Sequence, residues 1–144
     1  MPITVEGLFM ETLGRFPDGS VKWETPAHCP ESGVYVVSYQ RPICKADLSP
    51  EKIRAWIDRV PAMRIDGELP SDEAIMERLA GFMYPDETVL YIGQTSQPLH
   101  RRIQLFYRHI LGDRSPHRGG HWLKTLSIID DLTVSWCATD HPVD

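Results

Sequence analysis

The chain has 144 residues, of which 42% are hydrophobic and 24% are charged, a composition typical of one ordinary globular domain. This composition argues against a largely disordered chain, and the sequence holds no apolar run long enough to predict a membrane-spanning helix. Its N-terminus does not resemble a secretion signal, and its three scattered cysteines do not suggest a disulfide framework. We therefore expect a cytoplasmic protein with no membrane partner.

Charge is distributed unevenly along the chain. The net charge of −5 by itself disfavours a nucleic-acid partner. Between residues 94 and 125, however, six Lys or Arg residues stand against one acidic residue, a net charge of +5, and four of the six histidines lie in the same window. Such a basic window favours a polyanionic partner. The alternative is a solvated helix face that balances acidic residues elsewhere.

The first half of the chain predicts one central strand and two helices. Residues 1–32 are rich in turn formers and predict an irregular N-terminal arm with a short strand near residues 21–23. Residues 33–39, GVYVVSY, predict a strand that is apolar on both faces and therefore central in its sheet. Helices are predicted over residues 49–60 and 71–82, with Ser49 and Ser71 as their N-caps.

The second half predicts a strand, a basic helix, a further helix and a last strand. The strands cover residues 88–93, TVLYIG, and residues 132–139, LTVSWCAT. The basic helix begins near residue 96 and ends by residue 112, and residues 121–129 predict the further helix. These elements together predict a single mixed α/β domain over residues 1–144.

The basic helix distinguishes two adjacent arginines. At about 100° per residue, Arg101 and Arg108 point into solvent, whereas Arg102 lies at the border of the apolar stripe and His109 lies on the same side. A guanidinium held by packing suits a phosphate, because its planar fork can pair with two oxygens. The alternative is a border arginine whose head group forms a salt bridge. The apolar stripe itself comprises Leu99, Ile103, Phe106 and Ile110.

Three short motifs in this order resemble those of the GIY-YIG nuclease family. They are Gly33-Val34-Tyr35, Tyr91-Ile92-Gly93 and the Leu99-x-x-Arg102 of the basic helix. The resemblance implies a small antiparallel three-stranded sheet flanked by helices, beginning at residue 33 and preceded by an arm over residues 1–32. Because 55 residues separate the two tyrosines, residues 40–87 would be a helical insertion. The net charge of this insertion is −3, so we expect it to face protein or solvent rather than phosphate.

The resemblance also implies a reaction, the hydrolysis of DNA phosphodiester bonds with a divalent metal ion, with RNA as the alternative substrate. Tyr35 would help to activate the attacking water, Tyr91 would position water or phosphate, and Arg102 would bind phosphate. A phenol has a pKa near 10 and needs a nearby cation to act as a base at neutral pH. We therefore expect the two phenols and the guanidinium to converge. The alternative for each tyrosine is a strand aromatic with a satisfied hydroxyl.

Further residues are assigned on the same resemblance or on the basic window. Gly33 and Gly93 are the motif glycines, which would let backbone or ligand approach the tyrosines closely. His109 is taken as the catalytic histidine, although His117 and His121 compete for that role. The remaining basic residues would contact the nucleic-acid backbone. They are Arg101, Arg108, Arg114, His117, Arg118 and Lys124.

The metal ligand cannot be identified from the sequence. Mg²⁺ or Mn²⁺ is implied, but the family's ligand is a glutamate after the third strand, and the last glutamate here is Glu87. Asp140 followed by Pro142 resembles a helix start, so we expect a truncated chain whose parent continues with a helix there. The 144-residue form could then be inactive. Spacings of four residues leave open a zinc site of His117, His121, Cys137 and His141.

Two other functions stay open. The chain could be a catalytically inactive module that binds nucleic acid or protein on the same scaffold. It could also be an unrelated α/β domain in which the motifs are accidental.

Overall fold

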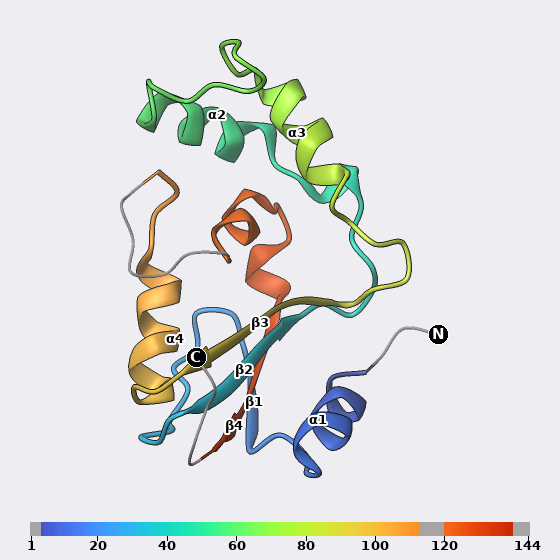
Figure 1. Ribbon diagram of the computed structural model, residues 1–144, viewed down its shortest axis with the longest axis vertical. Coiled ribbons are helices and arrows are strands. Elements are labelled where there is room, and N and C mark those ends of the chain that lie inside the picture. The colour runs from blue at the N-terminus through green and yellow to red at the C-terminus, as the bar shows by residue number, and fades with distance from the viewer. Residues whose placement is uncertain (1–3, 113–119, 140–144) are drawn as a thin grey trace.

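The computed structural model describes residues 4–112 and 120–139 (Figure 1). Within these residues the chain forms four α-helices and an antiparallel four-stranded sheet in the order β1-β4-β2-β3. The mixed α/β class is therefore confirmed. The strands are β1 (Gly19–Lys22), β2 (Gly33–Ser38), β3 (Val89–Thr95) and β4 (Thr133–Ala138). The helices are α1 (Val5–Leu13), α2 (Pro50–Arg59), α3 (Asp72–Ala80) and α4 (Leu99–Arg108), with short 3-10 turns η1 (Lys45–Asp47), η2 (His121–Thr125) and η3 (Ile129–Asp131).

Strand β2 lies in the interior of the sheet, as its apolar sequence predicts. It pairs with β3 on one side and with β4 on the other. Tyr35 and Val37 face the main core together with the buried side of α4. Val36 faces the opposite way, into a smaller cluster with Phe9 of α1 and Cys137 of β4. Helices α1 and α4 therefore lie against opposite faces of the sheet (Figure 1).

The N-terminal segment is more ordered than the sequence indicates. Residues expected to form an irregular arm contain α1, which begins where the N–H of Gly7 donates to the Thr4 hydroxyl (3.0 Å) and ends at Gly14 in a left-handed conformation (φ 70°). The strand expected near residues 21–23 is β1, which pairs with β4 in the same sheet. The expectation of a three-stranded sheet is therefore wrong, because this edge strand adds to it.

The segment between β2 and β3 contains the two expected helices. Ser49 and Ser71 cap them by accepting from the N–H groups of Lys52 (3.3 Å) and Ala74 (3.0 Å). Figure 1 shows α2 and α3 beyond one end of the sheet. The two ends of the segment are adjacent, since the Tyr39 N–H donates to the Thr88 carbonyl (2.9 Å). We call residues 40–87 the insertion from here on.

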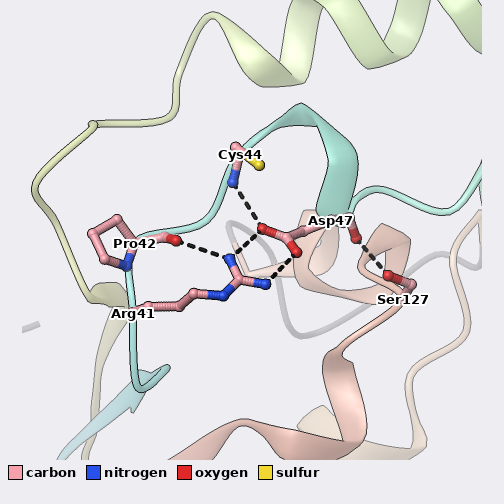
Figure 2. Close-up of polar contacts among 5 residues, drawn as sticks. All are labelled: Arg41, Pro42, Cys44, Asp47 and Ser127. Carbon is pink, nitrogen blue, oxygen red and sulfur yellow. Dashed lines mark hydrogen bonds and ion pairs between the residues drawn. The ribbon is translucent and has the colours of Figure 1, made fainter.

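Asp47 organises the start of the insertion through its buried carboxylate and connects it to the segment after η2 through its backbone carbonyl (Figure 2). Asp47 is 5% exposed and receives two hydrogen bonds from Arg41 (2.7 and 2.9 Å) and one from the Cys44 N–H (2.9 Å). Its backbone carbonyl accepts from the N–H and the hydroxyl of Ser127 (2.8 and 3.0 Å). The hydrogen bonds from Arg41, more than any other cause, hold the pKa of Asp47 below its ordinary value.

Two details of the second half differ from expectation. Helix α4 ends at Arg108, so Ile110 leaves the helical phase and is 53% exposed instead of completing the apolar stripe. Residues 121–129 form 3-10 turns rather than one α-helix. Among residues 4–112 and 120–139, none of the helices has both the length and the apolar character needed to cross a membrane.

Replacing Asp47 by Asn should destabilise the fold by about 2 kcal/mol at neutral pH, because the charged hydrogen bonds from Arg41 are lost in a buried setting. The folded-state pKa of Asp47 is lowered, so its contribution is present above the ordinary aspartate pKa and is lost as pH falls through the folded value. Urea denaturation at several pH values should show the difference between wild type and Asp47→Asn shrinking on acidification. Asp72→Asn, in a more exposed pair with Arg54, is the matched control and should cost less.

Candidate functional site

The two motif tyrosines lie on paired strands. Tyr35 of β2 is opposite Gly93 of β3, and Tyr91 is opposite Val37, so both tyrosines project from the same face of the sheet. Their ring centroids are 6.0 Å apart. The ring of Tyr35 passes directly beneath Gly93, where a Cβ would lie 2.6 Å from the Tyr35 hydroxyl oxygen. The glycine at this position is therefore what allows Tyr35 to reach Tyr91.

The guanidinium of Arg102 on α4 forms a hydrogen bond with the phenol of Tyr35. Burial is the largest cause that raises the pKa of Tyr35, and Tyr91 raises it further by its charge and by a hydrogen bond. Arg102 acts in the opposite direction, because its charge and its hydrogen bond favour the phenolate. The structure thus brings together the two phenols and the guanidinium, from three different elements.

The three side chains differ in their access to solution. Tyr35 is 1% exposed, whereas Tyr91 and Arg102 are half-buried. A ligand from solution would therefore meet Tyr91 and Arg102 first, with Tyr35 beneath them. Because the net effect on the pKa of Tyr35 is upward, its phenol is protonated at neutral pH in this structure. In that state Tyr35 can donate a hydrogen bond but cannot take a proton.

An aromatic layer supports this cluster from within the core. The ring of Phe106 lies 6.3 Å from that of Tyr35 and 5.6 Å from that of Tyr91. It also meets Trp23 edge-on at 5.1 Å. Phe106 was expected in the apolar stripe, one turn after Arg102, whereas Trp23 was expected only at the end of a short strand in the N-terminal arm. No local pattern in the sequence indicates that Trp23 packs here.

His109 occupies a different place from the other catalytic candidates. It follows the last residue of α4, and its ring stacks on that of His121 with centroids 4.0 Å apart. Seven residues along a helix correspond to roughly 10 Å, so the backbone of His109 is well separated from that of Arg102. The structure therefore does not place His109 beside the tyrosines, and its assignment to the site stays a prediction.

Two of the residues predicted to bind the nucleic-acid backbone line a groove on the outer side of α4. Arg101 and Arg108 are exposed, as their helical phase predicts. Together with His100 and with His28 from the segment before β2, they border a groove of about 800 Å³. The basic side chains and the absence of acidic residues among the lining residues that the structure describes suit this groove to a polyanion.

Lys124 is placed differently from these arginines. Its ammonium donates to the Tyr107 carbonyl (2.7 Å) and lies over the rings of Trp23 and Phe106, 5.2 and 5.7 Å from their centroids. Burial lowers its pKa to about 8. The structure thus places Lys124 partly in the core rather than on an open surface. The other candidates, Arg114, His117 and Arg118, lie outside the described residues.

The described residues do not assemble the zinc alternative. His121 stacks on His109, while Cys137 is fully buried in the cluster on the α1 face of the sheet, opposite the main core. His117 and His141 lie outside the described residues. Within residues 4–112 and 120–139, no group of three or more His, Cys, Asp or Glu side chains is placed to hold a metal ion.

The tyrosine cluster does not by itself make a cation site either. Its described side chains are two phenols and a guanidinium, whereas Mg²⁺ and Mn²⁺ prefer carboxylate oxygens. Asp130 and Asp131 lie in the exposed turn η3, and Asp113, Asp140 and Asp144 lie outside the described residues. The cluster instead has the composition of a site for an oxyanion, with one fixed positive charge and two hydroxyl groups.

Comparisons with protein-family models, with curated proteins and with solved structures found no match to this chain.

Replacing Gly93 by Ala should destabilise the fold by about 1–3 kcal/mol, because the new methyl group would overlap the Tyr35 ring in a packed layer. Urea denaturation would measure this cost. Gly81→Ala is the matched control, since a Cβ there meets only the carbonyl oxygens of Arg78 at 3.4 Å and Glu77 at 3.7 Å and should change stability little. Equal effects of the two substitutions would contradict the packing of Tyr35 under Gly93.

The raised pKa of Tyr35 predicts a loss of stability in alkali. Above the ordinary phenol pKa of about 10 the unfolded chain releases this proton while the folded chain retains it, so folding stability falls as pH rises. Tyr35→Phe removes this titration. The stability of wild type relative to Tyr35→Phe, measured by urea denaturation, should therefore be constant near neutral pH and decline above pH 10. A constant difference across that range would show that Tyr35 is not buried as described.

Proposed function

We propose that this chain is a nuclease domain of the GIY-YIG type that hydrolyses phosphodiester bonds of DNA. One observation carries the proposal, namely that Tyr35, Tyr91 and Arg102 meet at one place although they come from three elements. The motifs that suggested the family consist of these same residues. The basic groove along α4 supports a polyanionic substrate, with DNA preferred and RNA as the alternative.

Each side chain has a distinct part in the proposed reaction. Arg102 binds the scissile phosphate and offsets the charge that develops on its oxygens. Tyr91, also open to solution, orients the phosphate or the attacking water. Tyr35 lies behind both, where its protonated phenol accepts a hydrogen bond from the Arg102 guanidinium and forms another with the Tyr91 hydroxyl. Arg101 and Arg108 hold the neighbouring backbone phosphates in the groove.

The divalent ion implied by the resemblance, Mg²⁺ or Mn²⁺, needs an oxygen ligand that the three site residues do not supply. When bound, such an ion would neutralise the scissile phosphate. The proposed location is the cytoplasm, and the three free cysteines, Cys29, Cys44 and Cys137, suit a reducing compartment.

A second candidate function is a binding module without catalysis. The observation that favours it is the deep burial of Tyr35, whose phenol is not poised to remove a proton. In this case the arginines would hold nucleic acid, or the scaffold would hold a protein, and no bond would be cut.

Plasmid nicking by the full-length natural protein, with Mg²⁺ or Mn²⁺, tests the proposal. Arg102→Ala should lower the nicking rate by roughly 10²–10³-fold, the effect of removing one preorganised charge-stabilising group. Tyr91→Phe should lower it by roughly 10–10²-fold, because it deletes a hydroxyl that positions the reactants.

Arg101→Ala is the matched control on the same helix. It should weaken DNA binding and lessen its salt dependence by about one counterion, with a much smaller effect on the rate at saturating DNA. Nicking that survives Arg102→Ala would contradict the proposed site. Salt-dependent binding without any cleavage by the natural protein would favour the binding module instead.

A further inference from the structure

The two edges of the sheet differ in how well they are protected from pairing with another chain. Strand β1, at one edge, has four residues and ends with Lys22. Strand β3, at the other edge, has seven residues, VLYIGQT, with neither a charged residue nor a proline among them. Short length, lysine and proline are common means by which an edge strand avoids pairing with another chain. Strand β3 lacks all three.

The outer edge of β3 is open in the part of the chain that the structure describes. The strand pairs with β2 on one side, and neither residues 4–112 nor residues 120–139 supply a strand for its other side. Its pairing with β2 is irregular only between Val37 and Ser38, so residues 91–95 form a regular segment. Along such a segment, alternate N–H and C=O groups point away from the paired neighbour. This row of donors and acceptors suits an extended strand.

Apolar side chains accompany the open edge along its length. Near its middle, Ile92 is 50% exposed, and with Leu8 of α1 it lines a hollow of about 410 Å³. Near its start, Leu90 borders a hollow of about 490 Å³ together with Phe82 and Tyr84, which are 73% and 75% exposed. Exposed apolar surface of this kind is typical of an interface with another chain.

The charges at the two ends of β3 are opposite in sign. Asp86 and Glu87 precede the strand, whereas Arg101 follows it in the first turn of α4. Asp86 and Arg101 are exposed, and neither forms an ion pair within residues 4–112 and 120–139. When two β3 strands pair antiparallel, the acidic end of each lies beside the basic end of the other. The charges of β3 are therefore complementary to those of a second copy of the same strand.

We propose that this chain forms a two-fold symmetric dimer in which the β3 strands of two copies pair antiparallel and join their sheets into one. The Ile92 side chains of the two copies then approach one another near the middle of the paired strands. The symmetry axis passes through the sheet, so equivalent faces of the two copies lie on the same side. Both tyrosine clusters thus lie on one side of the joined sheet. The inference does not depend on the proposed function, because it rests on backbone pairing and surface charge.

Sedimentation velocity of the full-length protein at increasing concentration tests the dimer. We expect a reversible change from monomer to dimer with a Kd of roughly 1–100 µM, the range of a modest interface. A protein that stays monomeric up to about 1 mM would overturn the proposal.

Ile92→Lys should weaken this association by about tenfold or more, because it removes an apolar contact and places like charges near one another across the two strands. Ile110→Lys is the matched control, since it makes the same change at a residue that is 53% exposed and lies beyond the end of α4. It should leave the association unchanged. An equal loss with both variants, or no loss with Ile92→Lys, would overturn the role of the β3 edge.

Charge reversal tests the antiparallel direction without altering β3 itself. Asp86→Lys and Arg101→Glu should each weaken the association by about two- to fivefold, as expected for exposed ion pairs. The double variant should recover the affinity of the wild type, because the same two charges meet again with their signs exchanged. A double variant that associates no more tightly than the single variants would overturn the antiparallel pairing.

Hydrogen exchange identifies the strand that pairs. Backbone amides on the outer edge of residues 91–95 should exchange more slowly above the Kd than below it, whereas those of residues 19–22 in β1 should not change. A dimer without this slowing in β3 would overturn the proposal. A chain that stays monomeric, while a synthetic peptide of alternating valine and threonine slows the β3 amides, would assign the edge to another protein and also overturn the dimer.

Discussion

Burial of β2 on both faces is the constraint on which the rest of the structure depends. Tyr35, Val36 and Val37 are each at most 1% exposed, and the strand is paired along both edges. Since successive side chains alternate between faces, a slip of one residue would turn Tyr35 toward α1 and Val36 toward α4. Two glycines oppose such a slip. A Cβ at Gly33 would overlap the Cys137 carbonyl, and one at Gly93 would overlap the Tyr35 ring. The motif glycines therefore set the register that aims Tyr35 at Tyr91 and Arg102.

The elements predicted from the sequence are those whose signals are local. The sequence signals of β2, α2 and α3 lie within or next to these elements. Strand β2 is apolar on both faces, and a serine caps each of the two helices. Helix α1 and strand β1 were not fully predicted, because a helix of nine residues is marginal alone and depends on Phe9 packing against Val36 and Cys137. Ile110 was wrongly predicted to belong to the apolar stripe of α4, because the helical periodicity that placed it there ends with the helix at Arg108. Residues 121–129 were expected to be helical, but Ser127 bonds to Asp47 instead.

The candidate site was predictable to a similar extent. Helical phase alone distinguishes Arg102, half-buried, from Arg101, exposed. The depth of Tyr35 was not predictable, because it follows from the packing of α4 and Phe106 over the sheet. The basic window was counted as one surface, yet in the folded chain Arg101 and Arg108 line the groove along α4, while Lys124 points into the aromatic layer. A charge count along the sequence cannot separate these environments, because they depend on residues far away in the sequence, such as His28 for the groove and Trp23 for Lys124.

The attachment of residues 40–87 decides whether the domain could fold without them. The two ends of this insertion are adjacent at the Tyr39–Thr88 hydrogen bond, so a tight turn could replace it without disturbing the pairing of β2 with β3. Its first residues, however, have become part of the domain. Leu48 pairs with Leu126, and the Ser49 N–H donates to the Thr125 carbonyl (2.7 Å). Excision would uncover Leu126, which is now fully enclosed, and would leave that carbonyl without its donor. Residues 40–87 therefore act as a structural support of the domain, although their two ends are adjacent.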